Sequence, residues 1–189
     1  QAGACLADDM GLGKTLQALA IIVNRAKSGP TLVLAPTSVC LNWESEVVKF
    51  APTLRIINFS GKDRKQKIKT ATSFDIVICS YGLLQTEIET LKKIQFSTIV
   101  ADEAQAIKNP QAKRTQAAMQ LNGNFKIITT GTPIENHLGE LWSLFNFINP
   151  GLLGTLEQFN AQFTGNIEKG DEVVADQLRT LLKPFILRR

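Results

Sequence analysis

Short apolar runs alternate with longer amphipathic segments along the first three quarters of the chain. The apolar runs predict strands at residues 4–7, 31–35, 55–59, 75–79, 97–101 and 126–130. Several of these runs are rich in valine and isoleucine with little alternation, which is typical of strands buried on both faces. The amphipathic segments predict helices at residues 15–27, 39–50 and 138–148. On the first helix, the apolar face that we expect consists of Leu16, Leu19, Ala20 and Val23. This alternation predicts an α/β fold with a mainly parallel sheet and helices on both faces.

The pattern changes near Asn149, where the predicted strands cease. Helices follow at residues 155–163 and 174–182, with an expected loop at residues 165–171. We therefore expect a sheet domain at residues 1–149 and a helical extension of that domain at residues 150–189, rather than two independent domains.

Composition places few limits on this picture. The chain has 189 residues, of which 44% are hydrophobic and 20% charged, as in an ordinary globular domain. No apolar run approaches the roughly 18 residues that cross a bilayer, so we expect no membrane partner. The first residue is not methionine and a motif follows almost at once, so we expect a piece of a longer protein. The three cysteines lack metal-ligand spacing, which favours reduced thiols, in the cytoplasm of a bacterium or the nucleus of a eukaryote.

A mild excess of basic residues gives the chain a net charge of +4, which is compatible with a polyanionic partner. The densest basic run contains Lys62, Arg64, Lys65, Lys67 and Lys69. We interpret this run as a solvated helix face rather than a DNA-binding patch.

A glycine-rich loop between the first strand and the first helix carries the strongest chemical signal, DDMGLGKT at residues 8–15. Its two glycines allow a tight turn whose backbone N–H groups face phosphates, and the following helix N-terminus adds positive dipole. Lys14 can reach the outer phosphates, and the Thr15 hydroxyl can hold Mg²⁺. The strict P-loop pattern has glycine where Asp8 stands. The predicted nucleotide-binding residues are Met10, Gly11, Leu12, Gly13, Lys14 and Thr15.

Two carboxylates, Asp102 and Glu103, end another apolar strand. Asp102 would hold Mg²⁺, directly or through water. Glu103 would orient and deprotonate the attacking water. Alone, this pair would be an ordinary exposed strand end, but a phosphate-binding loop upstream favours a catalytic pair. With Lys14, these two residues form the predicted catalytic set.

A third polar segment, beginning at Thr129, follows the last predicted strand and places hydroxyl groups beside the expected nucleotide. The chain then resembles one family along its whole length. In order, the motifs are DDMGLGKT, LVLAPTSVCLNW, ICSYGLL, DEAQAIKN, TGTPIEN and PFILRR. They resemble the ordered motifs of the Swi/Snf-type ATPases, a branch of the second helicase superfamily. DEAQ in place of DEAD, followed by Lys108 and Asn109, favours this branch over the RNA helicases.

The resemblance implies a RecA-like P-loop fold, a three-layer α/β sandwich that uses ATP and Mg²⁺. Residues 1–149 would be the first RecA-like lobe, and residues 150–189 would lead to a second lobe with arginine fingers. Such proteins bind the backbone of double-stranded DNA across both lobes and translocate along it, usually without separating the strands.

The resemblance also assigns roles by position. Residues that would couple the nucleotide state to DNA are Gln105, Thr130, Gly131 and Thr132. Residues that would touch the DNA backbone are Pro36, Thr37, Ser38, Ser80 and Tyr81. Hydroxyl groups and helix N-terminal amides suit phosphate oxygens and carry no sequence information.

Simpler roles stay open for several of these residues. Ser80 and Tyr81 could form a strand-end turn with a satisfied hydroxyl, and Gln105 could merely fill a turn. Trp43 fits the core better than a base stack because its helical face is apolar. His137, the single histidine, fits an exposed or capping position better than catalysis.

Three functions are compatible with these motifs. The first is the ATP-binding lobe of a DNA-dependent ATPase, and the second is the equivalent lobe of an RNA helicase. The third is a nucleotide-regulated binding module without useful turnover. Because the resemblance places the arginine fingers in another lobe, we expect these 189 residues alone to bind ATP weakly and hydrolyse it slowly.

Overall fold

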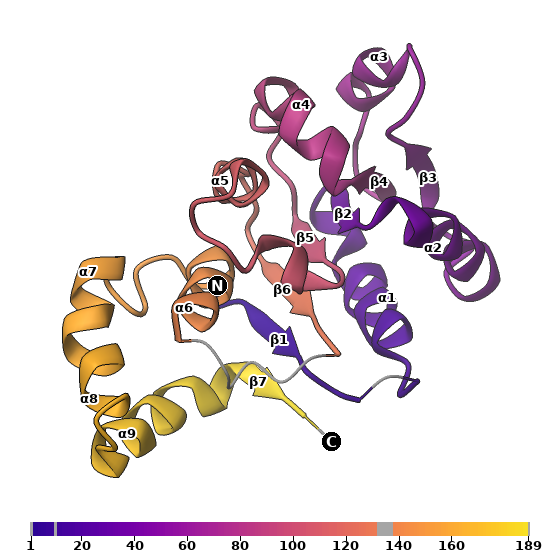
Figure 1. The fold of residues 1–189 in the computed structure, drawn as a ribbon. Coiled ribbons are helices and arrows are strands. Elements are labelled where there is room, and N and C mark those ends of the chain that lie inside the picture. The colour runs from indigo at the N-terminus through magenta and orange to yellow at the C-terminus, as the bar shows by residue number, and fades with distance from the viewer. Residues whose placement is uncertain (1, 10, 132–137, 189) are drawn as a thin grey trace.

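A parallel seven-stranded sheet forms the centre of the part of the chain described by the computed structural model, residues 2–9, 11–131 and 138–188. Its strand order is β3-β4-β2-β5-β6-β1-β7, and every pair of neighbours is parallel (Figure 1). The strands are β1 (Ala4–Leu6), β2 (Thr31–Ala35), β3 (Arg55–Asn58), β4 (Asp75–Ser80), β5 (Thr98–Ala101), β6 (Lys126–Thr129) and β7 (Ile186–Leu187). The first six confirm the six predicted strands within two residues at each end.

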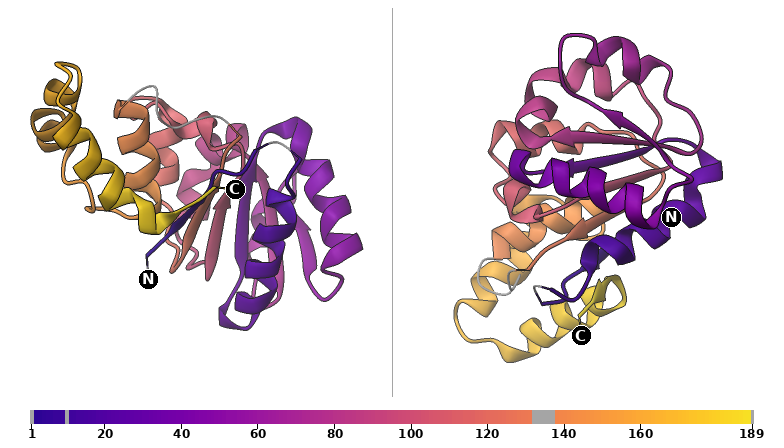
Figure 2. Two further views of the ribbon diagram at one scale, coloured as in Figure 1. Left: turned by 90° about the horizontal axis from the view of Figure 1, so that it is seen from below. Right: turned by 90° about the vertical axis from the view of Figure 1, so that its right-hand side faces the viewer.

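Helices cover both faces of the sheet, which confirms the expected three-layer α/β sandwich (Figure 2). One layer contains α1 (Lys14–Arg25) and α2 (Thr37–Phe50). The other contains α3 (Arg64–Lys69), α4 (Tyr81–Leu91), α5 (Lys113–Met119) and α6 (Leu138–Ile148). The central strand β2 shows why its sequence has no alternation: Leu32 and Leu34 pack into one layer, and Val33 and Ala35 into the other.

The buried face of α1 differs from the expected one. Ala18, Leu19 and Ile22 are buried, whereas Leu16 and Val23 are 42% and 39% exposed. Nearly every residue from Leu16 to Val23 is apolar, so the pattern alone did not distinguish two adjacent faces of the helix. Among the described residues, no helix is long and apolar enough to span a membrane.

The C-terminal quarter is mostly helical but returns to the sheet. A helical segment contains α7 (Leu156–Phe159), a π-helical turn (Asn160–Thr164) and α8 (Gly165–Ile167), and α9 (Glu172–Leu182) follows. The expected loop at 165–171 was therefore wrong for its first three residues, where helix continues past the π turn. The expectation that strands cease was also wrong, because β7 pairs with β1. A two-residue strand is too short for its apolar pattern to be recognised.

The helical extension shares the core of the sheet domain. Phe159, Phe163, Leu178 and Leu182 belong to the same apolar cluster as Leu32 of β2 and its neighbours. Figure 2 shows the extension beside α6, at the edge of the molecule next to β7. The boundary at residues 149 and 150 stays a prediction.

The three cysteines are free thiols in the structure. Cys5 and Cys79 are buried, and Cys40 is half-buried. Burial raises the pKa of Cys5 to about 12, and it raises the pKa of the other two thiols as well. Such thiols are protonated at neutral pH and react slowly with oxidants.

Candidate nucleotide and nucleic-acid site

The carboxyl ends of the parallel strands bring the predicted motifs to one edge of the sheet. The phosphate-binding loop follows β1, the acidic pair follows β5, and Thr130 follows β6. These three strands are neighbours in the order β5-β6-β1. Ligands of open parallel sheets bind at this edge, so the arrangement suits one nucleotide contacted by all three segments.

Two glycines give the phosphate-binding loop its shape. Gly11 and Gly13 have φ angles of 85° and 73°, in the left-handed region. A Cβ atom added to Gly11 would meet no atom within 4 Å, so backbone conformation rather than space requires glycine there. Gly13 is the N-cap of α1 and directs the first amides of the helix toward the loop. Met10 lies outside the described residues.

The Lys14 ammonium lies over this loop. Its Nζ donates to the carbonyl oxygens of Asp8, at 2.8 Å, and Asp9, at 3.0 Å. Thr15 is half-buried in the first turn of α1, and the side chain of Leu12 is exposed. The lysine and the threonine therefore lie beside the helix N-terminus, where phosphate oxygens would bind.

Asp8 replaces the first glycine of the strict P-loop pattern, and its side chain connects the loop to α1 by a hydrogen bond. It is fully buried, and its Oδ2 accepts a 2.9 Å hydrogen bond from Nε2 of Gln17 on α1. The Gln17 amide also donates to the carbonyl of Leu12. Asp8 is not among the residues with positive φ, so its position does not require glycine. Sequence reasoning missed Gln17, which lies two residues beyond the motif at residues 8–15.

Hydrogen bonds from three elements fix the carboxylate of Asp102, which is 8% exposed. The indole Nε1 of Trp43 on α2 donates to its Oδ2 at 2.7 Å. Oδ1 accepts from the Thr129 hydroxyl at the end of β6 and from the Glu103 amide at 3.0 Å. Trp43 is buried as expected, but its contact with Asp102 was missed. The contact of the Thr129 hydroxyl with Asp102 was also missed, although the polar segment that begins at Thr129 was expected beside the nucleotide.

Glu103, two residues after β5, has a left-handed conformation, with φ at 50°. This conformation costs a non-glycine residue roughly 1–2 kcal/mol and turns the chain sharply out of the strand. Its Oε2 accepts a 2.7 Å hydrogen bond from Nε2 of Gln105. Oε1 of Gln105 is buried, with no hydrogen-bond partner in the described part of the chain. Gln105 therefore holds the proposed base, and its role in coupling stays a prediction.

Two of the remaining predicted coupling residues, Thr130 and Gly131, lie beside the loop after β1. Thr130 is buried, and its amide donates to the carbonyl of Leu6 at 3.1 Å. Gly131 and Asp9 line a cavity of about 500 Å³ that extends to α9. Thr132 and His137 lie outside the described residues.

The first predicted DNA segment forms the start of α2. Pro36 is the N-cap, and Thr37 and Ser38 are exposed in the first turn. The Pro36 carbonyl accepts from the amides of Val39 and Cys40. No side chain caps this 14-residue helix, so its first amides and hydroxyls can reach an external acceptor.

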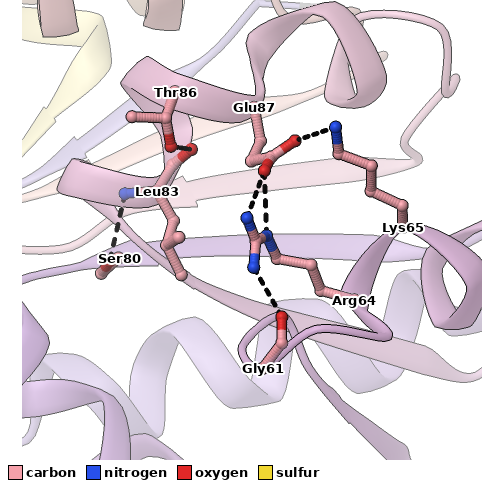
Figure 3. Close-up of polar contacts among 7 residues, drawn as sticks. All are labelled: Gly61, Arg64, Lys65, Ser80, Leu83, Thr86 and Glu87. Atoms are coloured by element: carbon pink, nitrogen blue, oxygen red, sulfur yellow. Dashed lines mark hydrogen bonds and ion pairs between the residues drawn. The ribbon is translucent and has the colours of Figure 1, made fainter.

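The second predicted DNA segment, Ser80 and Tyr81, lies at the start of α4, and the side chain of Tyr81 is buried. The Ser80 hydroxyl accepts from the Leu83 amide at 3.3 Å and caps the helix (Figure 3). Tyr81 is 5% exposed, and its hydroxyl donates to the backbone carbonyl of Asp102 at 2.8 Å. Burial raises the pKa of Tyr81 well above its usual value, so the phenol stays protonated. The Ser80 hydroxyl thus has the local partner of a strand-end turn.

The basic run on and before α3 is largely paired with carboxylates. Figure 3 shows Arg64 and Lys65 reaching the buried Glu87 of α4, with Arg64 Nε at 3.0 Å and Lys65 Nζ at 3.1 Å. Lys67 pairs with Asp63 at 2.9 Å. Hydrogen bonds from Arg64, and then from Lys65, lower the pKa of Glu87. This pairing suits a solvated helix face better than a DNA-binding patch.

Comparisons with known proteins agree with this arrangement. The SNF2-related domain matches residues 1–189. The chain belongs to this family. YwqA of Bacillus subtilis, named as an ATP-dependent helicase/translocase, is 45% identical to this chain over 99% of the chain's residues. The ISWI chromatin-remodeling complex ATPase CHR17 of Arabidopsis thaliana is 36% identical over 97% of it.

A solved SNF2 structure confirms the RecA-like fold class. The Sulfolobus solfataricus SWI2/SNF2 ATPase core in complex with dsDNA superposes with a TM-score of 0.90, at 45% identity over 100% of the chain. The chain covers 40% of that structure, 21% of YwqA and 18% of CHR17. The resemblance to Swi/Snf-type ATPases is therefore confirmed. The chain spans about a fifth of the length of these two curated relatives.

Proposed function

We propose that this SNF2-family chain is the first, ATP-binding lobe of a longer DNA-dependent ATPase that translocates on double-stranded DNA. The observation that carries the proposal is the position of Asp102. Side chains of α2 and α4, the two helices that begin with the predicted DNA segments, bond directly to this residue. Movement of either helix on DNA would therefore act on the carboxylate pair.

The residues at the sheet edge fit ATP with Mg²⁺. The left-handed glycines, Lys14 and the start of α1 suit the phosphates, and Thr15 with Asp102 suits the cation. No cluster of three metal-ligating side chains occurs among residues 2–9, 11–131 and 138–188. Mg²⁺ needs no such cluster, because it is usually bound by one or two side chains, phosphates and water. The cation would neutralise charge on the transferred phosphoryl group.

Glu103 is the proposed general base. Its carboxylate follows Asp102 directly and is held by the Gln105 amide. A base must lie within hydrogen-bond reach of the water that it activates, and Glu103 follows β5 at the sheet edge where the phosphates would bind.

Double-stranded DNA is the proposed nucleic-acid partner. The exposed first turn of α2, with Thr37 and Ser38, offers hydroxyls and uncapped amides to backbone phosphates. Two further facts support duplex DNA: the similar Sulfolobus core was solved in complex with dsDNA, and the chromatin-remodeling ATPase CHR17 is a relative.

The second RecA-like lobe is proposed from the coverage of the relatives, since the chain covers 40% of the Sulfolobus core. An arginine finger contributes about 10³–10⁵ in rate in comparable phosphoryl-transfer enzymes. If the fingers lie in that lobe, these residues alone would bind ATP weakly and hydrolyse it very slowly, as a nucleotide-regulated module would. Robust DNA-stimulated turnover by the isolated chain would refute this part of the proposal.

An RNA helicase lobe is the competing function, and a pair of assays on the full-length protein separates the two. We expect ATP-dependent displacement of a third strand from duplex DNA, which reports translocation, and no unwinding of an RNA duplex. RNA unwinding without DNA translocation would replace the proposal with the helicase function. The DEAQ sequence with Lys108 and Asn109 favours the first result.

A further inference from the structure

A hollow of about 450 Å³ lies between α4 and α5, and Tyr81 is the one predicted DNA residue that lines it. Its lining consists of Tyr81, Gly82 and Gln85 of α4 and Ala112, Lys113 and Arg114 at the start of α5. The two helices pack side by side on the same layer of the sheet (Figure 1). The lining includes two cations and no carboxylate, so an anion is the ligand that it favours.

The two cations differ from the basic run around α3. Arg64, Lys65 and Lys67 pair with carboxylates. Neither Lys113 nor Arg114 forms an ion pair within the described part of the chain, and both are exposed. Their charges are therefore available to an external partner. An arginine and a lysine together offer a guanidinium fork and a point charge, both of which bind phosphate well.

The sheet register places Tyr81, one of the residues that line the hollow, near the start of α2. Ala35 of β2 is paired with Ser80 of β4, so Thr37 and Tyr81 lie one or two residues beyond neighbouring strand ends. Neighbouring strands are about 4.8 Å apart. A DNA backbone that contacts the exposed first turn of α2 can therefore continue across the hollow at the same edge of the sheet.

Tyr81 connects the hollow to the carboxylate pair. One part of this side chain lines the hollow, and its hydroxyl donates to the carbonyl of Asp102. The positive charge of Arg114 lowers the pKa of the same phenol, whereas the negative charges of Asp102 and Glu103 raise it. A ligand bound at Arg114 thus lies one side chain away from the residue proposed to hold Mg²⁺.

We propose that this hollow binds a phosphate of the DNA backbone between Lys113 and Arg114, and that Tyr81 transmits its binding to Asp102. The proposal rests on the proposed function, because it takes duplex DNA as the ligand. It adds two phosphate-binding residues that the motifs do not include. It also assigns Tyr81 as a positioning residue, whose hydroxyl acts inward on the ATP site instead of contacting DNA.

Duplex binding tests the phosphate site. In the full-length protein, the double substitution Lys113→Ala with Arg114→Ala should weaken the binding of a labelled DNA duplex about tenfold. It should also reduce the slope of log affinity against log salt by about one, because the two cations bind one phosphate. The matched control is Lys27→Ala with Lys93→Ala, which removes two exposed charges that follow the C-terminal ends of α1 and α4. Equal affinities and slopes for the two double variants would overturn the site.

Steady-state kinetics test the role of Tyr81. The change Tyr81→Phe removes only the hydroxyl. We expect the ratio of DNA-stimulated to unstimulated kcat to fall about fivefold, while the duplex Kd and the KM for ATP stay within about twofold. The matched control is Thr86→Val, which removes a hydroxyl that bonds within α4 to the Leu83 carbonyl (Figure 3). An unchanged stimulation ratio in Tyr81→Phe would overturn the coupling.

The two experiments separate failure of this inference from failure of the proposed function. If the wild-type protein binds duplex and is stimulated, but both variants match their controls, the inference alone is wrong. If the wild-type protein binds duplex without any stimulation, the proposed function fails, and the binding comparison still decides the phosphate site. If the wild-type protein binds no duplex, both are wrong.

Discussion

The indole of Trp43 donates a 2.7 Å hydrogen bond to Oδ2 of Asp102, so the middle of α2 contacts the carboxylate at the end of β5. Both partners are buried, which makes the bond strong and its loss costly. A tryptophan on an apolar helix face therefore has two functions: it fills the core, and it orients a carboxylate of the proposed active site.

Replacement of this indole should cost both stability and activity. Trp43→Phe leaves a carboxylate oxygen without its donor, and hydrogen bonds to charged groups are worth about 1.5–3 kcal/mol. We expect the free energy of unfolding of the 189-residue chain to fall by about 2 kcal/mol in denaturant titrations. The matched control is Trp142→Phe, whose indole donates to the neutral Gly154 carbonyl at 3.2 Å. Equal losses for both variants would contradict this role of Trp43.

Removal of the Thr129 hydroxyl should affect hydrolysis more than nucleotide binding. Thr129→Val keeps the shape but deletes the donor to Asp102 Oδ1. In the full-length protein we expect kcat to fall about tenfold, with the KM for ATP within about twofold, because the hydroxyl orients a carboxylate that acts in the chemical step. A kcat equal to that of the wild type would rule out this role.

Thr115→Val is the control for this substitution. The Thr115 side chain is fully buried, and its hydroxyl has no hydrogen-bond partner among the described residues. Removal of an unsatisfied buried hydroxyl should leave stability unchanged or raise it.

Lys126 should make stability depend on pH in alkaline solution. Burial lowers the pKa of this lysine from 10.5 to about 8, while its ammonium lies 4.8 Å from the Phe147 ring centroid. Because the folded pKa is the lower one, Lys126 binds more protons in the unfolded chain between about pH 8 and 10.5, and its contribution to stability rises with pH there. The buried thiols have raised pKa values and contribute with the opposite sign above about pH 9, so the lysine is measured as the difference between wild type and Lys126→Met. In thermal unfolding, Lys126→Met should be more stable than the wild type by about 2 kcal/mol at pH 7, and this advantage should shrink as the pH rises from about 8 to 10.5. An advantage that does not change over this range would show that the lysine stays charged when folded.

DNA binding by the full-length protein should depend on salt and not on sequence. The proposed contacts are hydroxyls, amides and cations that bind phosphates, which all sequences share. We expect two duplexes of equal length and different sequence to bind with similar affinity. Between 50 and 200 mM salt, both affinities should fall at least about tenfold. A salt-independent affinity would point to another mode of binding.

The sequence predicted the sheet well because its strands are buried on both faces and are continuously apolar. It did not predict α4, whose start is joined directly to β4 and whose interior is interrupted at Glu87. It also missed α5, a seven-residue helix with only a short buried face of Thr115, Ala117 and Ala118. Short or interrupted helices lack the repeated period on which sequence patterns depend.

The sequence brought the candidate site to one sheet edge through its local motifs, and the roles of the individual residues there stay predictions. Lys14, Asp102 and Glu103 carry chemistry that their residue types and local motifs reveal. Trp43 and Thr129 support Asp102 through contacts that the fold creates across the sheet, 59 and 27 residues away in sequence. A single sequence carries no signal of such long-range contacts, and the inward direction of the Tyr81 hydroxyl was hidden for the same reason.

The rate of ATP hydrolysis by the full-length protein, with and without duplex DNA, tests the central claim most directly when wild type and Glu103→Gln are compared. We predict that duplex DNA accelerates the wild type, and that Glu103→Gln binds ATP with unchanged affinity but shows no accelerated turnover. Wild-type hydrolysis that no duplex stimulates, or full turnover by Glu103→Gln, would contradict it.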